Sequence, residues 1–338
     1  MTDFSRESAV NKYIDTMSFK QIIGQEIALK ILQNSLKEKR RGLTYLFYGP
    51  RGTGKSFAAR QFSKALNCDQ AQNEDSCDIC SSCLRIEKLE YPDLHWLDLE
   101  EGSSNIKIEQ IRSLQNEISL KPFEARTKIF VINNCQNLTA EAANCLLKTT
   151  EEPPADSIII LITTDLRLVL STISSRALKL RFSQLNRNQT AQILEKDTAL
   201  NGEQISFFSR YLEGRIAMYP QLNKHEFIQQ REDLFNGLFN HSPLTKLEDL
   251  FKDKNQTLDN LYILTSCFRD ILFIKSGSRT EYLINQDKVA LINKEADKYT
   301  LARVLSILEN LSKSFEYLKR NLNLKLLTDN IWLNFPAA

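Results

Sequence analysis

One stretch decides the fold of this chain: Gly49-Pro50-Arg51-Gly52-Thr53-Gly54-Lys55-Ser56. It fits the pattern G-x-x-x-x-G-K-[ST], in which backbone N–H groups and the lysine hold phosphates and the hydroxyl holds Mg²⁺. Residues 44–48 before it are β-branched and aromatic, as in a buried strand, and residues 56–66 after it have the apolar spacing of a helix. This context disfavours a chance glycine-rich turn. The stretch therefore predicts an α/β nucleotide-binding fold with a P-loop, and it leaves hydrolysis open.

Composition describes a soluble globular chain. It has 338 residues, 42% hydrophobic and 25% charged, which is enough for two or three domains. A net charge of +2 gives no global attraction to nucleic acid, so a DNA contact would need a local patch or a shared assembly. The polar N-terminus lacks a signal core, and no apolar run reaches membrane-spanning length. We expect a cytoplasmic protein without membrane contact.

Cysteines are clustered rather than scattered: four of the seven are Cys68, Cys77, Cys80 and Cys83. Four thiolates complete a tetrahedral zinc site, and two-residue gaps let a tight turn aim successive sulfurs at one ion. The polar segment between the first two cysteines is too short for a core of its own, so metal would fold it. The pattern predicts a structural Zn²⁺, because four protein ligands leave no open position for chemistry. Free thiols are the alternative, and the acidic insert argues against a DNA-gripping module.

The strand expected at 128–132 is followed by Asn133-Asn134. A P-loop ATPase usually carries at this place the acids that coordinate Mg²⁺ and activate water. An amide cannot replace a carboxylate as a base, and it is a weaker ligand for Mg²⁺. The pair therefore predicts nucleotide binding with little hydrolysis.

Apolar periodicity predicts the remaining elements. A poorly ordered lead-in is expected over residues 1–15. Up to residue 182, helices are expected over 25–39, 56–66, 106–120 and 139–152, strands over 44–48, 94–99, 128–132, 157–164 and 177–182, and a short polar link over 171–176. After residue 182 only helices are expected, over 188–200, 203–211, 227–239, 246–252, 258–275, 288–296, 301–321 and 324–333. Long helices with short polar connections describe an all-α bundle.

Several stretches together carry a family resemblance: residues 22–26, the loop at 49–56, the four clustered cysteines, residues 144–154 (NCLLKTTEEPP), 163–165, 174–177, 269–270 and 321–327. With them, almost the whole chain resembles the AAA+ clamp-loader subunits of bacterial DNA polymerase III. The resemblance implies an AAA+ domain at 1–182, with a parallel sheet covered by helices on both faces and a zinc module at 68–83. A small helical lid domain at 183–223 and an all-α collar domain for oligomerisation at 224–338 would follow.

Two subunit classes of this family share these features. Gamma/tau is the ATPase motor, whereas delta-prime is usually weak or inactive toward ATP. Asn133-Asn134 in place of the motor's acids favours delta-prime, as does the end of the chain just past the collar, while the intact P-loop favours an active motor. We expect a delta-prime subunit. The alternatives are a catalytically active gamma-like motor and a zinc-dependent DNA-binding protein outside any clamp loader.

The resemblance also implies roles for single residues. The loop would bind ATP or ADP with Mg²⁺, Ile22 and Ile23 would lie near the base, and Thr164 matches a sensor position. Arg176 matches an arginine that reaches into a neighbouring subunit's ATP site; without the resemblance it would be interpreted as a surface residue at a strand start. Arg215 is a weak match to a second sensor.

The implied partners are the gamma/tau and delta subunits, the sliding clamp and, through the assembly, primer–template DNA. ATP binding by such an assembly would open the clamp, and hydrolysis would release it on DNA.

Overall fold

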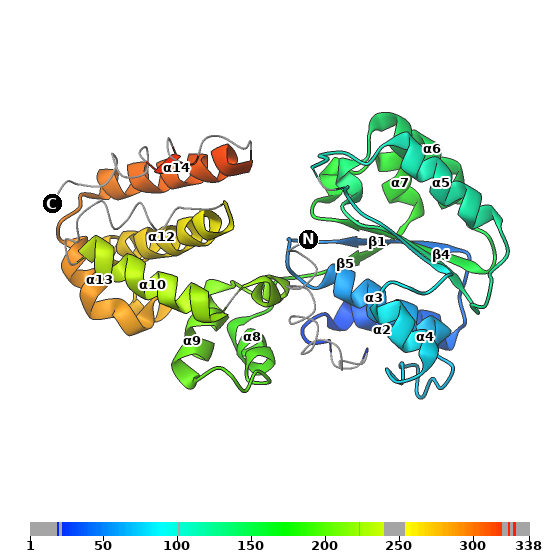
Figure 1. The fold of residues 1–338 in the computed structure, drawn as a ribbon, viewed down its shortest axis with the longest axis horizontal. Coiled ribbons are helices and arrows are strands. Elements are labelled where there is room, and N and C mark those ends of the chain that lie inside the picture. The colour runs from blue at the N-terminus through cyan, green and yellow to red at the C-terminus, as the bar shows by residue number, and fades with distance from the viewer. Residues whose placement is uncertain are drawn as a thin grey trace. The chain divides into compact units, whose positions relative to one another are not determined.

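The structure of the chain is a computed structural model, which describes residues 19, 22–100, 102–222, 224–239, 254–319, 324 and 327–328. It divides into two compact units, Met1–Asp197 with Leu212–Gln221 and Thr198–Tyr211 with Leu222–Ala338 (Figure 1). The expected lead-in, the helix at 246–252 and most of the helix at 324–333 lie outside the described residues. The division into three domains with boundaries at 182 and 223 stays a prediction.

A five-stranded parallel sheet forms the centre of the first unit. In the spatial order β2-β3-β4-β1-β5 it contains Leu94–Leu97, Lys128–Ile132, Ser157–Thr163, Leu43–Tyr48 and Leu178–Arg181. Tyr48, the last residue of β1, pairs with Thr163 of β4 and Arg181 of β5. Because all five strands run the same way, the segments that follow them lie together beyond the carboxyl ends of the strands. The parallel α/β sheet expected from the sequence is confirmed.

Helices cover both faces of this sheet (Figure 1). One face carries α2 (Glu26–Lys37), α3 (Lys55–Asn67) and α4 (Ser81–Glu87), and the other carries α5 (Ile108–Ser119), α6 (Ala140–Glu151) and α7 (Ser171–Arg176). Strand residues alternate between the two cores: Tyr45 and Phe47 pack on the first face and Leu46 on the second. Both cores are therefore built from the same strands.

Two helices of the first unit differ from expectation. Residues 171–176 form α7 instead of a polar link, because Ile173 is buried in the core to which α6 also contributes. The helix α8 is Arg187–Leu194 and ends earlier than residue 200. Short 3-10 turns complete the unit: η2 (Cys135–Asn137), η3 (Leu166–Leu168) and η4 (Ile216–Gln221).

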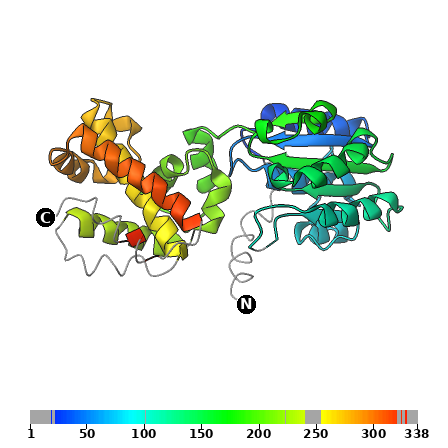
Figure 2. The ribbon, with the colours of Figure 1, turned by 90° about the horizontal axis from the view of Figure 1, so that it is seen from above.

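The second unit contains only helices and turns among its described residues. They are α9 (Gly202–Tyr211), α10 (Lys224–Phe239), α12 (Lys254–Lys275), η6 (Thr280–Tyr282), η7 (Gln286–Lys288), α13 (Val289–Ala296) and α14 (Leu301–Lys319). Figure 2 shows α14 crossing α12, and the two are in contact. The aromatic rings of Phe207, Phe208 and Phe227 pack together in its core. The helical character expected after residue 182 is confirmed for the described residues.

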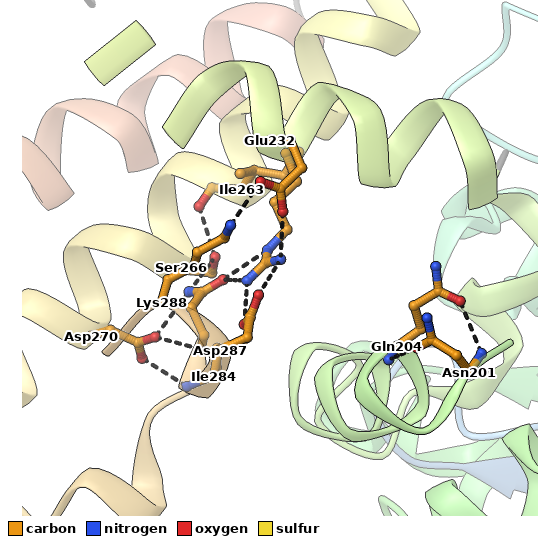
Figure 3. A network of polar contacts seen from close by, with 11 residues as sticks. Asn201, Gln204, Glu232, Ile263, Ser266, Asp270, Ile284, Asp287 and Lys288 are labelled. Atoms are coloured by element: carbon orange, nitrogen blue, oxygen red, sulfur yellow. Dashed lines mark hydrogen bonds and ion pairs between the residues drawn. The ribbon is translucent and has the colours of Figure 1, made fainter. Parts of the chain in front are cut away.

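A buried polar network fixes α10 and α12 to the turn at η7 (Figure 3). Arg231, only 4% exposed, donates to Asn285 Oδ1 and to both carboxylate oxygens of Asp287. Asp270 is fully buried and accepts from the backbone N–H groups of Ile284 and Asn285 at 2.9 and 2.7 Å. Burial raises the pKa of Asp270, although these N–H groups oppose the shift. The network joins segments far apart in sequence.

Candidate nucleotide and metal sites

The P-loop follows β1 and leads into α3, as the sequence pattern predicts. Gly49 has φ 145°, and a Cβ there would lie 2.0 Å from the carbonyl oxygen of Phe182. Gly54 precedes α3 in a left-handed conformation at φ 86°. Thr53 Oγ1 donates to the carbonyl of Pro50 at 2.9 Å and closes the turn. Glycine is required at both positions, because a side chain would clash at the first and strain the backbone at the second.

Lys55 points back into its own loop. Its Nζ donates to the carbonyls of Gly49 and Pro50, each at 2.7 Å, and the residue is 6% exposed. Burial lowers the pKa of this ammonium to about 8, since no carboxylate among the described residues compensates for the lost hydration. A buried cation whose acceptors, within the described residues, are carbonyl oxygens is well placed to gain an anionic partner such as a phosphate.

The segment before α2 is fastened to the P-loop. Gln25 is buried; its Nε2 donates to the carbonyl of Ser183 at 2.8 Å and to that of Thr53 at 3.4 Å, and its Oε1 accepts from Ser183 N. Ile22 and Ile23, both half-buried, lie three and two residues before it. Both therefore precede a residue that is hydrogen-bonded to the loop, and their role near the base stays a prediction.

A carboxylate stands next to the two amides that follow β3. Asp98, directly after β2, accepts from Asn133 Nδ2 at 2.7 Å and from Asn134 Nδ2 at 2.9 Å. Ser56 Oγ of the P-loop donates to Asn133 Oδ1 at 3.4 Å. The sequence interpretation recorded the missing acids but overlooked Asp98. Asp98 could have been found from the sequence, because residues that follow neighbouring parallel strands meet at the carboxyl ends of those strands.

Thr164 and Arg215 also lie near the loop. Thr164 follows β4, the strand between β3 and β1, and its N–H faces Gln136 Oε1 at 3.4 Å. A Cβ at Gly52 would lie 2.9 Å from Cβ of Arg215, and the N–H of Ala217 donates to Gly52 O at 3.0 Å. Thr164 and the weakly supported Arg215, both expected at a nucleotide site, therefore lie at the same carboxyl ends of the strands as the P-loop.

Arg176 lies near the starts of the sheet strands, whereas the P-loop lies beyond their carboxyl ends. It ends α7 just before β5, and Leu178 of β5 pairs with Tyr45, near the start of β1. The P-loop begins beyond the other end of β1, a strand of six residues that spans about 20 Å. Arg176 Nη1 donates to Thr172 O at 2.8 Å, and Nη2 pairs with Glu151. The arginine therefore cannot serve the loop of its own chain.

The four clustered cysteines converge. The sulfurs of Cys68, Cys77, Cys80 and Cys83 all lie within 4.8 Å of one another. Backbone N–H groups point at two of them, Cys77 N at Cys68 Sγ and Cys80 N at Cys77 Sγ, both at 3.3 Å. Burial would raise the pKa of Cys77, but the N–H groups of Ile79 and Cys80 outweigh it and lower the value to about 7. The cluster has the donor type and spacing of a site that could hold a metal ion.

Buried charges fasten the cysteine module to α3. Lys64, 1% exposed, pairs with Asp78 at 3.2 Å and also with Glu87. Arg60 Nη1 adds a second cation at 2.9 Å from Glu87. These cations lower the pKa of Glu87 although its burial acts in the other direction. The helix α3, which begins at the P-loop, is therefore also the helix to which the cysteine module is anchored by ion pairs.

Comparisons with known proteins agree with the fold and the loop, which define an α/β protein of the P-loop class. A family model described as "DNA polymerase III, delta subunit" matches residues 24–186, and its C-terminal counterpart matches residues 225–335. DNA polymerase III subunit delta-prime of Bacillus subtilis is 30% identical, over 91% of this chain and 95% of that protein. The chain belongs to the family of bacterial DNA polymerase III clamp-loader subunits that includes delta-prime and tau/gamma.

Two further relatives differ in how much of their length this chain matches. The tau subunit of Bacillus subtilis is 29% identical over 89% of this chain, but the chain spans only 58% of that protein's length. A solved structure of a gamma-subunit-related protein from Thermotoga maritima is 21% identical with a TM-score of 0.42, covering 90% of this chain and 97% of that one. Within the part of the chain that the structure describes, no helix is both long and apolar enough to cross a membrane.

Proposed function

We propose that this chain is a delta-prime-type subunit of a bacterial clamp loader that retains a nucleotide with little hydrolysis of its own. The observation that carries the proposal is the end of β3, where Asn133 and Asn134 are amides beside a complete P-loop. Lys55 and Ser56 would hold the phosphates and Mg²⁺ of ATP or ADP. With neither acid present, no carboxylate at these two positions can take the proton of an attacking water.

The catalytic contribution in this proposal is made to another subunit. Arg176 lies near the starts of the sheet strands, away from its own P-loop, and its side chain is 39% exposed. A guanidinium offers planar donors to the charge that develops on a transferring phosphoryl group. We assign Arg176 as the arginine that completes the ATP site of a neighbouring gamma/tau subunit. Delta, the sliding clamp and primer–template DNA are the further partners proposed for the assembly.

The test is a loader reconstituted from its cognate subunits with this chain carrying Arg176→Ala. Turnover at the adjoining motor site should fall by roughly 10³-fold, so the assembly loses that site's share of its clamp-stimulated ATPase. The matched control is Arg167→Ala, which removes an exposed arginine whose ion pair, among the described residues, is with Asp165. Wild-type ATPase and clamp loading by the Arg176 variant would overturn the role in trans.

An active gamma-like motor is the second candidate, favoured by the completeness of the P-loop around Lys55. The purified chain decides between the two. ATP turnover that Lys55→Ala abolishes would establish the motor and contradict the proposal of a site without hydrolysis. Nucleotide binding without turnover, lost in Lys55→Ala, is the result expected here.

For the cysteine module we propose one structural Zn²⁺ per chain. The sulfur geometry and the N–H···S contacts support it, because such contacts stabilise thiolates around an ion.

The second unit is likewise proposed to act in oligomerisation, as the collar of the assembly. Sedimentation of the chain mixed with its partner subunits tests this role.

A further inference from the structure

We propose that Asp98 supplies the negative charge of a divalent-cation site formed with Ser56 and Asn133. This inference rests on the nucleotide binding proposed above and identifies the residue that replaces the missing acids. It would explain how a loop flanked by two amides can still hold a nucleotide with its metal.

The first step of the argument is the orientation of Asn133. An amide side chain can face either way, and its hydrogen bonds decide which. The Nδ2 of Asn133 donates to Asp98 Oδ2 at 2.7 Å, so its Oδ1 must face the other side. On that side lies Ser56 Oγ, at 3.4 Å. Asp98 therefore turns an amide oxygen toward the hydroxyl that a P-loop uses for its cation.

The second step concerns charge. Mg²⁺ prefers oxygen ligands and is usually held by one or two carboxylates in addition to phosphates. Neither Asn133 nor Asn134 carries a charge, whereas Asp98 is one hydrogen bond away from both. A carboxylate behind a ligand raises the ligand's basicity, as it does behind metal-bound histidines. Asp98 is therefore a positioning residue that acts through Asn133.

The third step separates this role from that of a general base. Asp98 Oδ1 accepts from Asn134 Nδ2 at 2.9 Å and from the N–H of Leu99 at 2.8 Å, and Oδ2 accepts from Asn133. Both oxygens are thus engaged by N–H donors, and the side chain is directed at the amides. This arrangement supports metal binding and fits the weak hydrolysis proposed for the chain.

The experiment measures binding of a fluorescent ADP analogue to the full chain, in Mg²⁺ and in EDTA, and binding of Mn²⁺ with ADP by electron paramagnetic resonance. Asp98→Asn should leave the affinity in EDTA unchanged and reduce the gain from Mg²⁺ by roughly tenfold. The matched control is Glu100→Gln, which removes an exposed carboxylate two residues further on. It should keep the full gain.

A double variant makes the test independent of local damage. Asp98→Asn with Asn133→Asp returns one carboxylate to the site and keeps a hydrogen bond between the two positions, with donor and acceptor exchanged. We expect it to recover the Mg²⁺ gain and the Mn²⁺ signal. A wild-type Mg²⁺ gain in Asp98→Asn, or none in the wild-type chain, would overturn the inference alone. Nucleotide binding that is absent, or unaffected by Lys55→Ala, would overturn the proposed function together with it.

Discussion

Arg176 and Glu151 form an ion pair in which Nη2 of the arginine lies 2.5 Å from Oε1 of the glutamate. The two residues end α7 and α6, so the pair links the last turns of two helices on the same face of the sheet. Their side chains are 39% and 40% exposed. An ion pair this exposed contributes little to stability, so its effect should be on the orientation of the arginine.

We therefore predict that Glu151→Gln lowers the ATPase of a reconstituted loader without unfolding the chain. The free energy of unfolding should change by less than about 1 kcal/mol. Loss of the partner lets the guanidinium leave its position, and a misplaced catalytic group costs roughly tenfold or more in rate. Glu152→Gln is the control, because no ion pair joins that exposed neighbour to Arg176 among the described residues. An unchanged or faster ATPase would show that Glu151 does not position the arginine.

The pH dependence of nucleotide affinity follows from the lowered pKa of Lys55, which is about 8. Only the charged ammonium attracts phosphate, and its population falls from about nine-tenths at pH 7 to about one-tenth at pH 9. Affinity for a fluorescent ADP analogue should therefore be highest below pH 8 and fall roughly tenfold by pH 9. Lys55→Ala should bind weakly with no such slope. A flat profile for the wild-type chain would contradict the prediction.

Much of the first unit could be predicted because its strands are short, apolar and bounded by polar residues. The P-loop pattern alone predicted a strand before it and a helix after it, and both are present. The strand β3 was expected at Lys128–Ile132, as observed. The helix α7 was missed because Ser171, Thr172, Ser174 and Ser175 hide its one buried residue, Ile173. Periodicity has little to detect in six residues with one apolar side chain.

The site was harder to predict than the fold, because its key contacts join residues far apart in sequence. Asp98 lies 35 positions before Asn133, and nothing local to either residue indicates the pairing. Sheet order decides it: β2 lies beside β3, so the residues that follow them are neighbours. The contact of Lys64 with Asp78 likewise depends on how the cysteine module folds onto α3. Sequence spacing singled out the four clustered cysteines but not the residues that anchor their module to α3.

For the cysteine module we predict that Cys80→Ser removes the bound metal and loosens residues 68–90. Its backbone N–H points at Cys77 Sγ and its own sulfur lies 3.9 Å from that of Cys68, so the substitution opens the cluster. Metal analysis should give about one Zn²⁺ per wild-type chain, and hydrogen exchange should accelerate across the module after its loss. Cys145→Ser, a half-buried cysteine outside the cluster, is the control. Equal zinc content in both variants would contradict the assignment.

In the second unit, Arg231→Met should be strongly destabilising. The guanidinium is 4.1 Å from the ring centre of Phe207 and donates to the fully buried Asn285 and to the more exposed Asp287, so its removal leaves the Oδ1 of Asn285 without this donor. Leaving a buried acceptor without its hydrogen-bond donor costs about 1–3 kcal/mol. Thermal unfolding should show the loss, while the affinity for ADP, which we propose for the first unit, should stay unchanged. Arg279→Met removes an exposed pair with Glu281 and should cost less than about 1 kcal/mol. Equal losses in the two variants would mean that the network of Arg231 adds nothing beyond a surface ion pair.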